Sequence, residues 1–325
     1  MPRRRMKTQK EKEQVTAPNL RVLIFKGSRA VNPLIDPIIK IIKNKEDIDW
    51  LSINLPPTNF IKAFESTEFA IENFHPSIAI CTGDRIDMTA AAYACYINNI
   101  PIAHVYAGIR DSYPFATKDC MNRHSISLWA DLVFCEDEKC RKRVELLYKL
   151  VNKRKRKKIY NVGITHLDRA EPLYSFVPKK PYILVLFNAL HNKSANLREI
   201  DMLKIEIAKY SDYKKIIIGP NKDLLHEFNH AIMKNLKNAA YYNQLEHDQF
   251  LGLMERSSKF ITNSSCAFYE APHYLEKENI IIVGSRNKDR RPLTKLRTGA
   301  SKRIVNILEQ WLNYNQKKAM SLELV

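Results

Sequence analysis

Three short apolar runs decide the fold: SIAIC (77–81), IPIAHVY (100–106) and DLVFC (131–135). Two stretches with helical apolar spacing, 87–98 and 119–130, lie between them. Short apolar runs rich in β-branched residues are typical of buried strands, and strands that alternate with helices of this length form parallel sheets. This part of the chain therefore predicts the centre of a doubly wound α/β domain.

The same alternation continues in both directions. Upstream we expect strands at RVLIF (21–25) and WLSIN (50–54) and helices at 33–43 and 59–74, and downstream a helix at 136–150 and a strand at IYNV (159–162). A stretch with three prolines, EPLYSFVPKKP (171–181), then reads as a linker. Beyond it we expect strands at 182–187, 215–218, 239–242, 259–262 and 279–283 and a closing helix at 300–315.

The chain of 325 residues thus divides into two α/β domains, since domains commonly hold about 100–200 residues. We predict a disordered basic tail at 1–18, an N-terminal domain at 19–170, the linker at 171–181, a C-terminal domain at 182–315 and a tail at 316–325. Both domains are expected to be doubly wound and Rossmann-like.

The net charge of +18 is concentrated in two places. Residues 1–14 hold six basic and two acidic residues, and residues 139–158 hold eleven basic and one acidic. Such blocks are either solvated faces or contacts for polyanions such as nucleic acid or an anionic membrane surface. Contact of 139–158 with a polyanion is therefore a hypothesis, with a solvated block as the alternative.

The expected cellular compartment follows from the absence of a spanning segment and of a secretory signal in this sequence. No apolar run approaches the roughly 18 residues of a spanning helix, and no apolar segment follows the basic N-terminus as in a secretory signal. The six cysteines form no C-x-x-C pair, and several lie in apolar strand-like runs where cysteine behaves as a small buried hydrophobe. We expect a reducing, cytoplasmic location.

Glycines mark the ends of strands. The chain has eight, and six of them follow predicted strands: Gly27, Gly83, Gly108, Gly163, Gly219 and Gly284. Glycine permits unusual dihedral angles and close backbone approach, and ligands of open α/β sheets bind beyond the carboxyl ends of the strands. The expected site lies at those ends, although tight turns alone also favour glycine.

Charged residues gather at the strand ends of the first half. Gly83-Asp84-Arg85 follows one strand, and Asp119 and Arg123 share one face of the helix after the next. If Asp84 and Asp119 face one cleft they can share proton transfer, whereas the alternative for Asp119 and Arg123 is a surface ion pair. No dinucleotide fingerprint or P-loop follows the first strand, but Arg29 there could bind a phosphate or carboxylate.

The second half offers an anion site. Ser264 and Ser265 follow a strand and precede the helix that carries Glu270. Hydroxyls together with free amides at a helix N-terminus attract anions. A basic loop that could lie over a diphosphate then follows, with Arg286, Lys288, Arg290, Arg291, Lys295 and Arg297.

One motif points elsewhere. His226-Glu227-Phe228-Asn229-His230 matches H-E-x-x-H, in which two histidines one helical turn apart bind zinc. No extension of the motif follows and no third ligand is evident. We therefore predict neither a metal site nor a cofactor.

Several of these motifs together resemble the UDP-N-acetylglucosamine 2-epimerases. The resemblance covers about residues 20–310 and rests on Gly83-Asp84-Arg85, on Asn263-Ser264-Ser265 followed by Glu270-Ala271-Pro272, and on GSRNKDR (284–290), with Val162-Gly163 and Asp168 between the domains. The last two of the three stretches look more like the hydrolysing branch, which releases UDP and N-acetylmannosamine. The resemblance implies a GT-B-like fold with the ligand, UDP-N-acetylglucosamine, in the cleft between the domains, and a homo-oligomer.

The resemblance also implies roles for individual residues. Catalysis would fall to Asp84, Asp119, Arg123 and, after a loop shift, His191. UDP would be bound by Arg29, Arg85, Ser264, Ser265, Glu270, Arg286 and Arg290.

Two positions depart from the family pattern. Tyr106 stands where the family has a glutamate, and Asn188 where it has a histidine. Asp111 could reach back into the site and supply the carboxylate that the family's glutamate provides. The expected reaction is elimination of UDP, which needs a base at C2 of the sugar and stabilisation of the departing diphosphate. The sequence thus predicts an amino-sugar nucleotide 2-epimerase, with a catalytically impaired UDP-sugar-binding protein and a GT-B glycosyltransferase as the alternatives.

Overall fold

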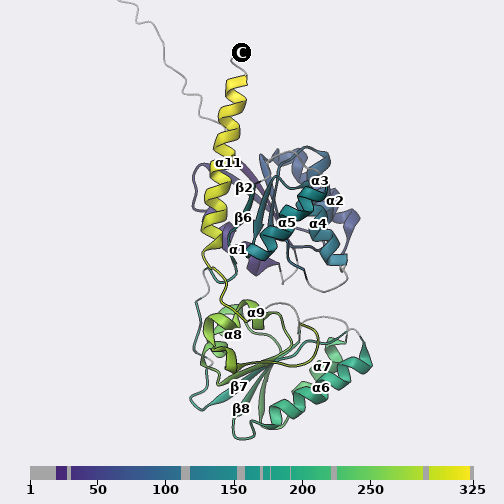
Figure 1. Ribbon diagram of the computed structural model, residues 1–325, viewed down its shortest axis with the longest axis vertical. Helices are drawn as coiled ribbons and strands as arrows, with labels where there is room; N and C mark the ends of the chain where they lie inside the picture. Colours follow the sequence, from purple (N-terminus) through teal and green to yellow (C-terminus); the bar gives the residue numbers. More distant parts are fainter. Residues whose placement is uncertain are drawn as a thin grey trace, which may run out of the picture.

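The computed structural model describes residues 20–27, 31–110, 118–151, 158–168, 171–175, 177–190, 192–220, 225–287 and 293–322. They form two α/β domains, one above the other (Figure 1). The predicted tail at 1–18 lies outside these ranges, as do residues 152–157 of the basic stretch 139–158.

The first domain contains a parallel sheet of six strands in the order β2-β1-β3-β4-β5-β6. Its strands are β1 (Leu20–Lys26), β2 (Ile48–Asn54), β3 (Ile78–Thr82), β4 (Ile102–Ala107), β5 (Leu132–Cys135) and β6 (Lys158–Asn161). Its first five helices are α1 (Asn32–Ile42), α2 (Phe60–Phe74), α3 (Ile86–Ile97), α4 (Lys118–Trp129) and α5 (Glu138–Leu150). Helices α2 to α5 pack against one another in chain order: α2 contacts α3, α3 contacts α4 and α4 contacts α5.

The second domain contains a parallel sheet of five strands in the order β11-β10-β7-β8-β9. Its strands are β7 (Tyr182–Leu186), β8 (Lys214–Ile218), β9 (Ala239–Tyr242), β10 (Lys259–Thr262) and β11 (Ile280–Ile282). Its helical segments are α6 (Lys193–Ala208), α7 (His226–Lys234), α8 (His247–Arg256), α9 (Cys266–Tyr269), α10 (Ala271–Tyr274) and the 3₁₀ turn η1 (Lys277–Asn279). The prediction of two doubly wound domains is confirmed.

Side-chain caps fix several helix starts. The side chain of Asn59 accepts a hydrogen bond from the Lys62 amide at 3.0 Å, and Asp137 does the same for the Cys140 amide at 2.7 Å. Asn192 repeats the pattern with the Ala195 amide at 2.9 Å. Each cap satisfies an amide that the first turn of a helix leaves unpaired.

Successive apolar side chains of the second sheet point to opposite faces, as the two-residue period of a strand requires. Tyr182 and Leu184 pack with α8, α9 and α10 on one face, whereas Ile183 and Val185 pack with α6 and α7 on the other. Both faces of a doubly wound sheet are buried, so its strands read as continuous apolar runs.

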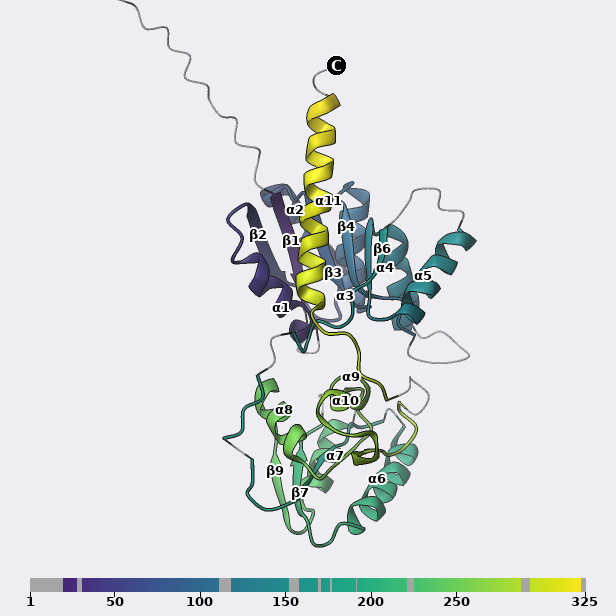
Figure 2. The ribbon, with the colours of Figure 1, turned by 60° about the vertical axis from the view of Figure 1, so that its left-hand side comes forward.

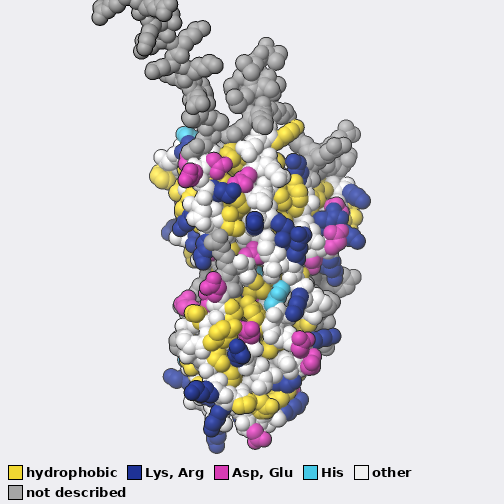
Figure 3. All heavy atoms as spheres, turned by 90° about the vertical axis from the view of Figure 1, so that its left-hand side faces the viewer, with side chains coloured by type: hydrophobic (Ala, Val, Ile, Leu, Met, Phe, Trp, Pro, Cys, Tyr) yellow, Lys and Arg dark blue, Asp and Glu magenta, His cyan; other side chains and the backbone are white. Residues whose placement is uncertain are grey.

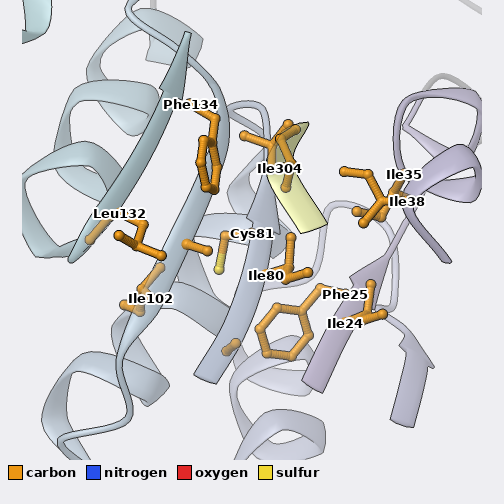
Figure 4. Packing of buried hydrophobic residues seen from close by; sticks show 14 of the residues in the cluster. Ile24, Phe25, Ile35, Ile38, Ile80, Cys81, Ile102, Leu132, Phe134 and Ile304 are labelled. Atoms are coloured by element: carbon orange, nitrogen blue, oxygen red, sulfur yellow. The ribbon is translucent and has the colours of Figure 1, made fainter. Parts of the chain in front are cut away.

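The terminal helix corrects the predicted domain boundary. Helix α11 (Ala300–Leu322) extends past residue 315 and packs against α1 of the first domain (Figures 1 and 2). Ile304 lies in the first-domain core with Ile35 and Ile80 (Figure 4). The prediction that 300–315 belongs to the second domain is therefore wrong: the helix buries its apolar face on the first sheet.

The cysteines and the apolar content of the helices agree, over the described residues, with the expectations from the sequence. The six cysteines are free, and all but Cys266 are buried. Although α11 has 23 residues, neither it nor any other helix among the described residues is apolar enough over a sufficient length to cross a bilayer. On the face in Figure 3, Lys and Arg side chains are scattered over both domains.

Candidate active site

A cavity of about 450 Å³ lies between the domains, at the carboxyl ends of both sheets. The first domain contributes loops after β3 and β4 and parts of α1 and α4, and the second contributes the loop after β10 and the start of α8. The predicted site residues that line it are Asp84, Arg85, Asp119, Arg123, Ser264, Ser265 and Glu270. Residues separated by up to 186 positions thus meet in one cavity, as a doubly wound fold predicts.

A partly buried ion pair joins two elements of the first domain in this cavity. Gly83 takes a φ of +80°, which turns the chain after β3 and presents Asp84. Arg123 on α4 is 5% exposed, and its guanidinium pairs with the Asp84 carboxylate and donates to the Ile109 carbonyl at 2.7 Å. Asp119, one turn earlier on the same helix, is exposed and borders the cavity as well. Asp84 and Asp119 therefore line the same cavity.

Arg85 is held at the cavity by a second carboxylate. Its Nε donates to Asp87 Oδ1 at 3.1 Å, and Asp87 is fully buried in the first turn of α3. Because the Arg85 side chain remains 30% exposed, its charge is available to a ligand.

Tyr106 occupies a strained position in β4. Its φ is +62°, a value that residues other than glycine rarely adopt, and the register of β4 against β5 shifts around it. Its hydroxyl lies 3.0 Å from Thr165 Oγ1 and 3.0 Å from His166 Nδ1, and it accepts from the Thr165 amide at 2.9 Å. Burial raises the pKa of Tyr106 above its ordinary value, so the phenol is protonated at neutral pH.

A histidine and a carboxylate pair on the second-domain side. His247 Nε2 lies 2.7 Å from Glu270 Oε1, and both side chains line the cavity. Burial by itself lowers the pKa of His247, but the hydrogen bond to Glu270 and the charge of that carboxylate outweigh burial and leave the pKa raised. Glu270, which the sequence predicts to hold the ribose, thus already has a hydrogen-bond partner in His247.

The serine loop is fixed by the strand ends around it. The Thr262 hydroxyl accepts from the Ser264 amide at 2.9 Å, and Asn263 Oδ1 accepts from the Asn188 amide at 2.7 Å. Asn263 Nδ2 donates back to the Asn188 carbonyl at 2.9 Å. Asn188 is therefore part of a buried clamp between the ends of β7 and β10.

Arg286 is not among the described residues that line the cavity. Its guanidinium donates to the Ala189 carbonyl, and the neighbouring Ser285 amide and hydroxyl each donate to Glu199 at 2.7 Å. The predicted residues Arg29, His191 and Arg290, and the alternative Asp111, lie outside the described residues.

Residues that the sequence analysis did not assign also border the cavity, namely His166, His247 and Tyr269. His166 lies between Gly163 and Asp168, both noted for their place between the domains, and that position could have identified it. The H-E-x-x-H segment lies elsewhere: it opens α7, and His230 Nδ1 is 2.7 Å from the Tyr241 hydroxyl.

The fold and the cavity define a GT-B-like protein, with two Rossmann-like domains around a shared site. The family model for UDP-N-acetylglucosamine 2-epimerase matches residues 58–323, and the chain belongs to that family.

Two curated relatives carry names of the hydrolysing branch. The chain is 25% identical over 245 residues to the GDP/UDP-N,N'-diacetylbacillosamine 2-epimerase (hydrolyzing) of Campylobacter jejuni. This match covers 70% of this chain and 61% of the relative. The chain is 26% identical over 253 residues to the UDP-N,N'-diacetylbacillosamine 2-epimerase (hydrolyzing) of Legionella pneumophila, covering 70% and 59%. The matches thus span about three fifths of the length of these relatives.

Solved structures share the fold at low identity. The S. aureus MnaA–UDP complex superposes with a TM-score of 0.73 at 17% identity, covering 90% of this chain and 97% of the other. The Neisseria meningitidis UDP-GlcNAc 2-epimerase bound to UDP-GlcNAc gives 0.70 at 16%, covering 90% and 100%.

Proposed function

We propose that the protein is a hydrolysing 2-epimerase acting on UDP-N-acetylglucosamine or a closely related UDP-linked 2-acetamido sugar. The products would be UDP and the free sugar epimerised at C2. The observation that carries the proposal is the meeting of Asp84, Arg123, Ser264 and Glu270 in one interdomain cavity. The names of the two curated relatives support the hydrolysing reaction.

The proposed roles follow from the chemistry of each side chain. Ser264, Ser265 and Arg85 would hold the diphosphate, since hydroxyls and a guanidinium suit phosphate oxygens. Glu270 would hold the ribose hydroxyls. Asp84 and Asp119 would exchange protons with the sugar, and Arg123 would orient Asp84. Arg29, His191, Arg286 and Arg290 remain proposed members of the site.

One NMR experiment tests the function. The protein is incubated with UDP-N-acetylglucosamine and, separately, with UDP-N,N'-diacetylbacillosamine in D₂O. UDP together with a free 2-epimer deuterated at C2 is the expected result. A UDP-linked epimer would indicate epimerisation without hydrolysis, and an acceptor-dependent glycoside would indicate transfer. UDP binding without turnover would leave a binding protein.

Self-association is part of the same proposal. An aromatic face on α3 and α4 supports it: Tyr96 is 50% exposed and stacks on Trp129 at 5.8 Å between ring centroids, and Ile97 beside it is 46% exposed. Light scattering of the protein and of Tyr96→Glu measures it, and a monomer at micromolar concentration contradicts it. Contact of residues 139–158 with polyanions stays a prediction.

A further inference from the structure

The segment between the domains places a histidine at the cavity. His166 borders it together with Asp84, Ser264 and Glu270, and the residue as a whole is 8% exposed. Its Nδ1 contacts the Tyr106 hydroxyl at 3.0 Å, and its ring meets Tyr269 edge-on at 6.1 Å between centroids. The imidazole is therefore held from two sides.

The surrounding hydrogen bonds assign its tautomer. The Thr165 hydroxyl donates its proton to the Leu34 carbonyl, so it can only accept from Tyr106. The Tyr106 hydroxyl therefore donates to Thr165 Oγ1, accepts from the Thr165 amide at 2.9 Å and has one lone pair left for His166. The proton between Tyr106 and His166 must then belong to Nδ1.

This tautomer leaves a basic nitrogen for the cavity. No hydrogen-bond partner of Nε2 exists among the described residues. Burial lowers the pKa of His166 to about 4, so the ring is neutral at pH 7 and Nε2 carries a free lone pair. The carboxylates of Asp84 and Glu270, by contrast, are each already paired with a cationic or basic side chain.

We propose that His166 is the general base that removes the C2 proton of the sugar, and that Tyr106 and Thr165 are positioning residues that fix its tautomer. This inference rests on the proposed function. It also accounts for the departure at Tyr106: a tyrosine replaces the family's glutamate and a neighbouring histidine supplies the base.

The step balances as an elimination followed by hydration. Nε2 takes the C2 proton, the C2–H electron pair becomes the C1=C2 bond, and the C1–O bond breaks with its pair leaving on UDP. Water then adds across the double bond, with hydroxide to C1 and a proton to C2 from the opposite face, and Nε2 releases the proton that it took from C2 to solvent. The sum is UDP-sugar plus water giving UDP plus the free 2-epimer.

The decisive variant is His166→Asn, because an asparagine amide can still donate to Tyr106 while the basic Nε2 is lost. We expect kcat to fall by about 10²–10⁴-fold, the usual contribution of a general base. The Kd for UDP, measured by calorimetry, should stay within about threefold. A variant that binds UDP and keeps more than a tenth of wild-type kcat overturns the inference.

Imidazole rescue separates chemistry from packing. In His166→Gly, added imidazole should raise kcat at least about tenfold, in proportion to the concentration of its neutral form. His273→Gly is the matched control, since His273 accepts from the Leu296 amide outside the cavity lining, and its rate should not respond to imidazole. Absence of rescue in a His166→Gly protein that binds UDP contradicts the role as base.

The tautomer is tested by ¹⁵N NMR of the imidazole. The wild-type ring should carry its proton on Nδ1, and Tyr106→Phe should move it toward Nε2 and lower kcat with little change in KM. A wild-type proton on Nε2 overturns the positioning roles. If wild type releases no UDP from either sugar nucleotide, the proposed function fails; if wild type is active and His166→Asn equally so, only this inference fails.

Discussion

The chain passes between the domains twice, and Asp168 joins the two connecting segments by hydrogen bonds. Its carboxylate accepts from the amide of Gly299, just before α11, and, at 2.6 Å, from the amide of Ser301 in the first turn of α11. The Ile164 amide donates to the Arg297 carbonyl at 2.9 Å beside it. We predict that Asp168→Ala destabilises the first domain, because α11 packs in that domain's core.

The magnitude follows from the bonds that are lost. A helix N-cap side chain contributes about 1 kcal/mol, and hydrogen bonds to a charged group contribute about 1.5–3 kcal/mol each. Asp168 is half-buried, so water replaces part of the loss. We expect the free energy of unfolding to fall by about 2–3 kcal/mol and Tm by about 5–10 °C, at about 2–4 °C per kcal/mol for a domain of this size.

Tryptophan fluorescence measures this domain selectively. All three tryptophans, Trp50, Trp129 and Trp311, pack against the first-domain core. Urea titrations of wild type and Asp168→Ala are compared with Asp201→Ala, whose side chain is 68% exposed and pairs only at the surface with Lys204. A change within about 0.5 kcal/mol of wild type for Asp168→Ala, equal to the control, would refute the reasoning.

Two further predictions concern the cavity, and a third concerns His104, a buried histidine of β4. Replacing Ser264 and Ser265 by alanine should weaken UDP binding at least about tenfold, roughly 1.4 kcal/mol by calorimetry, and unchanged affinity contradicts their place at the diphosphate. Asp84→Asn should lower turnover by about 10²–10⁴-fold with UDP affinity near wild type, and equal turnover in a rate assay removes it from the chemistry. Burial lowers the pKa of His104 to about 3, from about 6.5 in the unfolded chain. Because the unfolded state therefore takes up the proton first, the free energy of unfolding decreases as the pH falls from about 6.5 to about 3. Urea titrations against pH should show a shallower acid loss for His104→Gln, and parallel curves would contradict this.

The sequence alone determined the order and kind of the elements. Strands such as β3 and β4 are buried along their whole length and mostly apolar because both faces of a doubly wound sheet are buried, so their bounds could be predicted to within one or two residues. Asp84 and Ser264 could be predicted as site residues for another reason. Both follow strands, and the carboxyl ends of parallel strands meet at one edge of the sheet.

Only the tertiary structure decided which distant residues meet. Helix α11 is amphipathic, and an amphipathic pattern says that a face is buried but not against which sheet, so its return to the first domain could not be predicted. The partner of Arg123 depends in the same way on how α4 packs beside the loop after β3, and it proved to be Asp84. The position of His166 between Gly163 and Asp168 indicates only that it lies between the domains. Its contact with Tyr106, 60 positions away, could not be predicted, because contacts at that range are set by the packing of the chain rather than by local pattern.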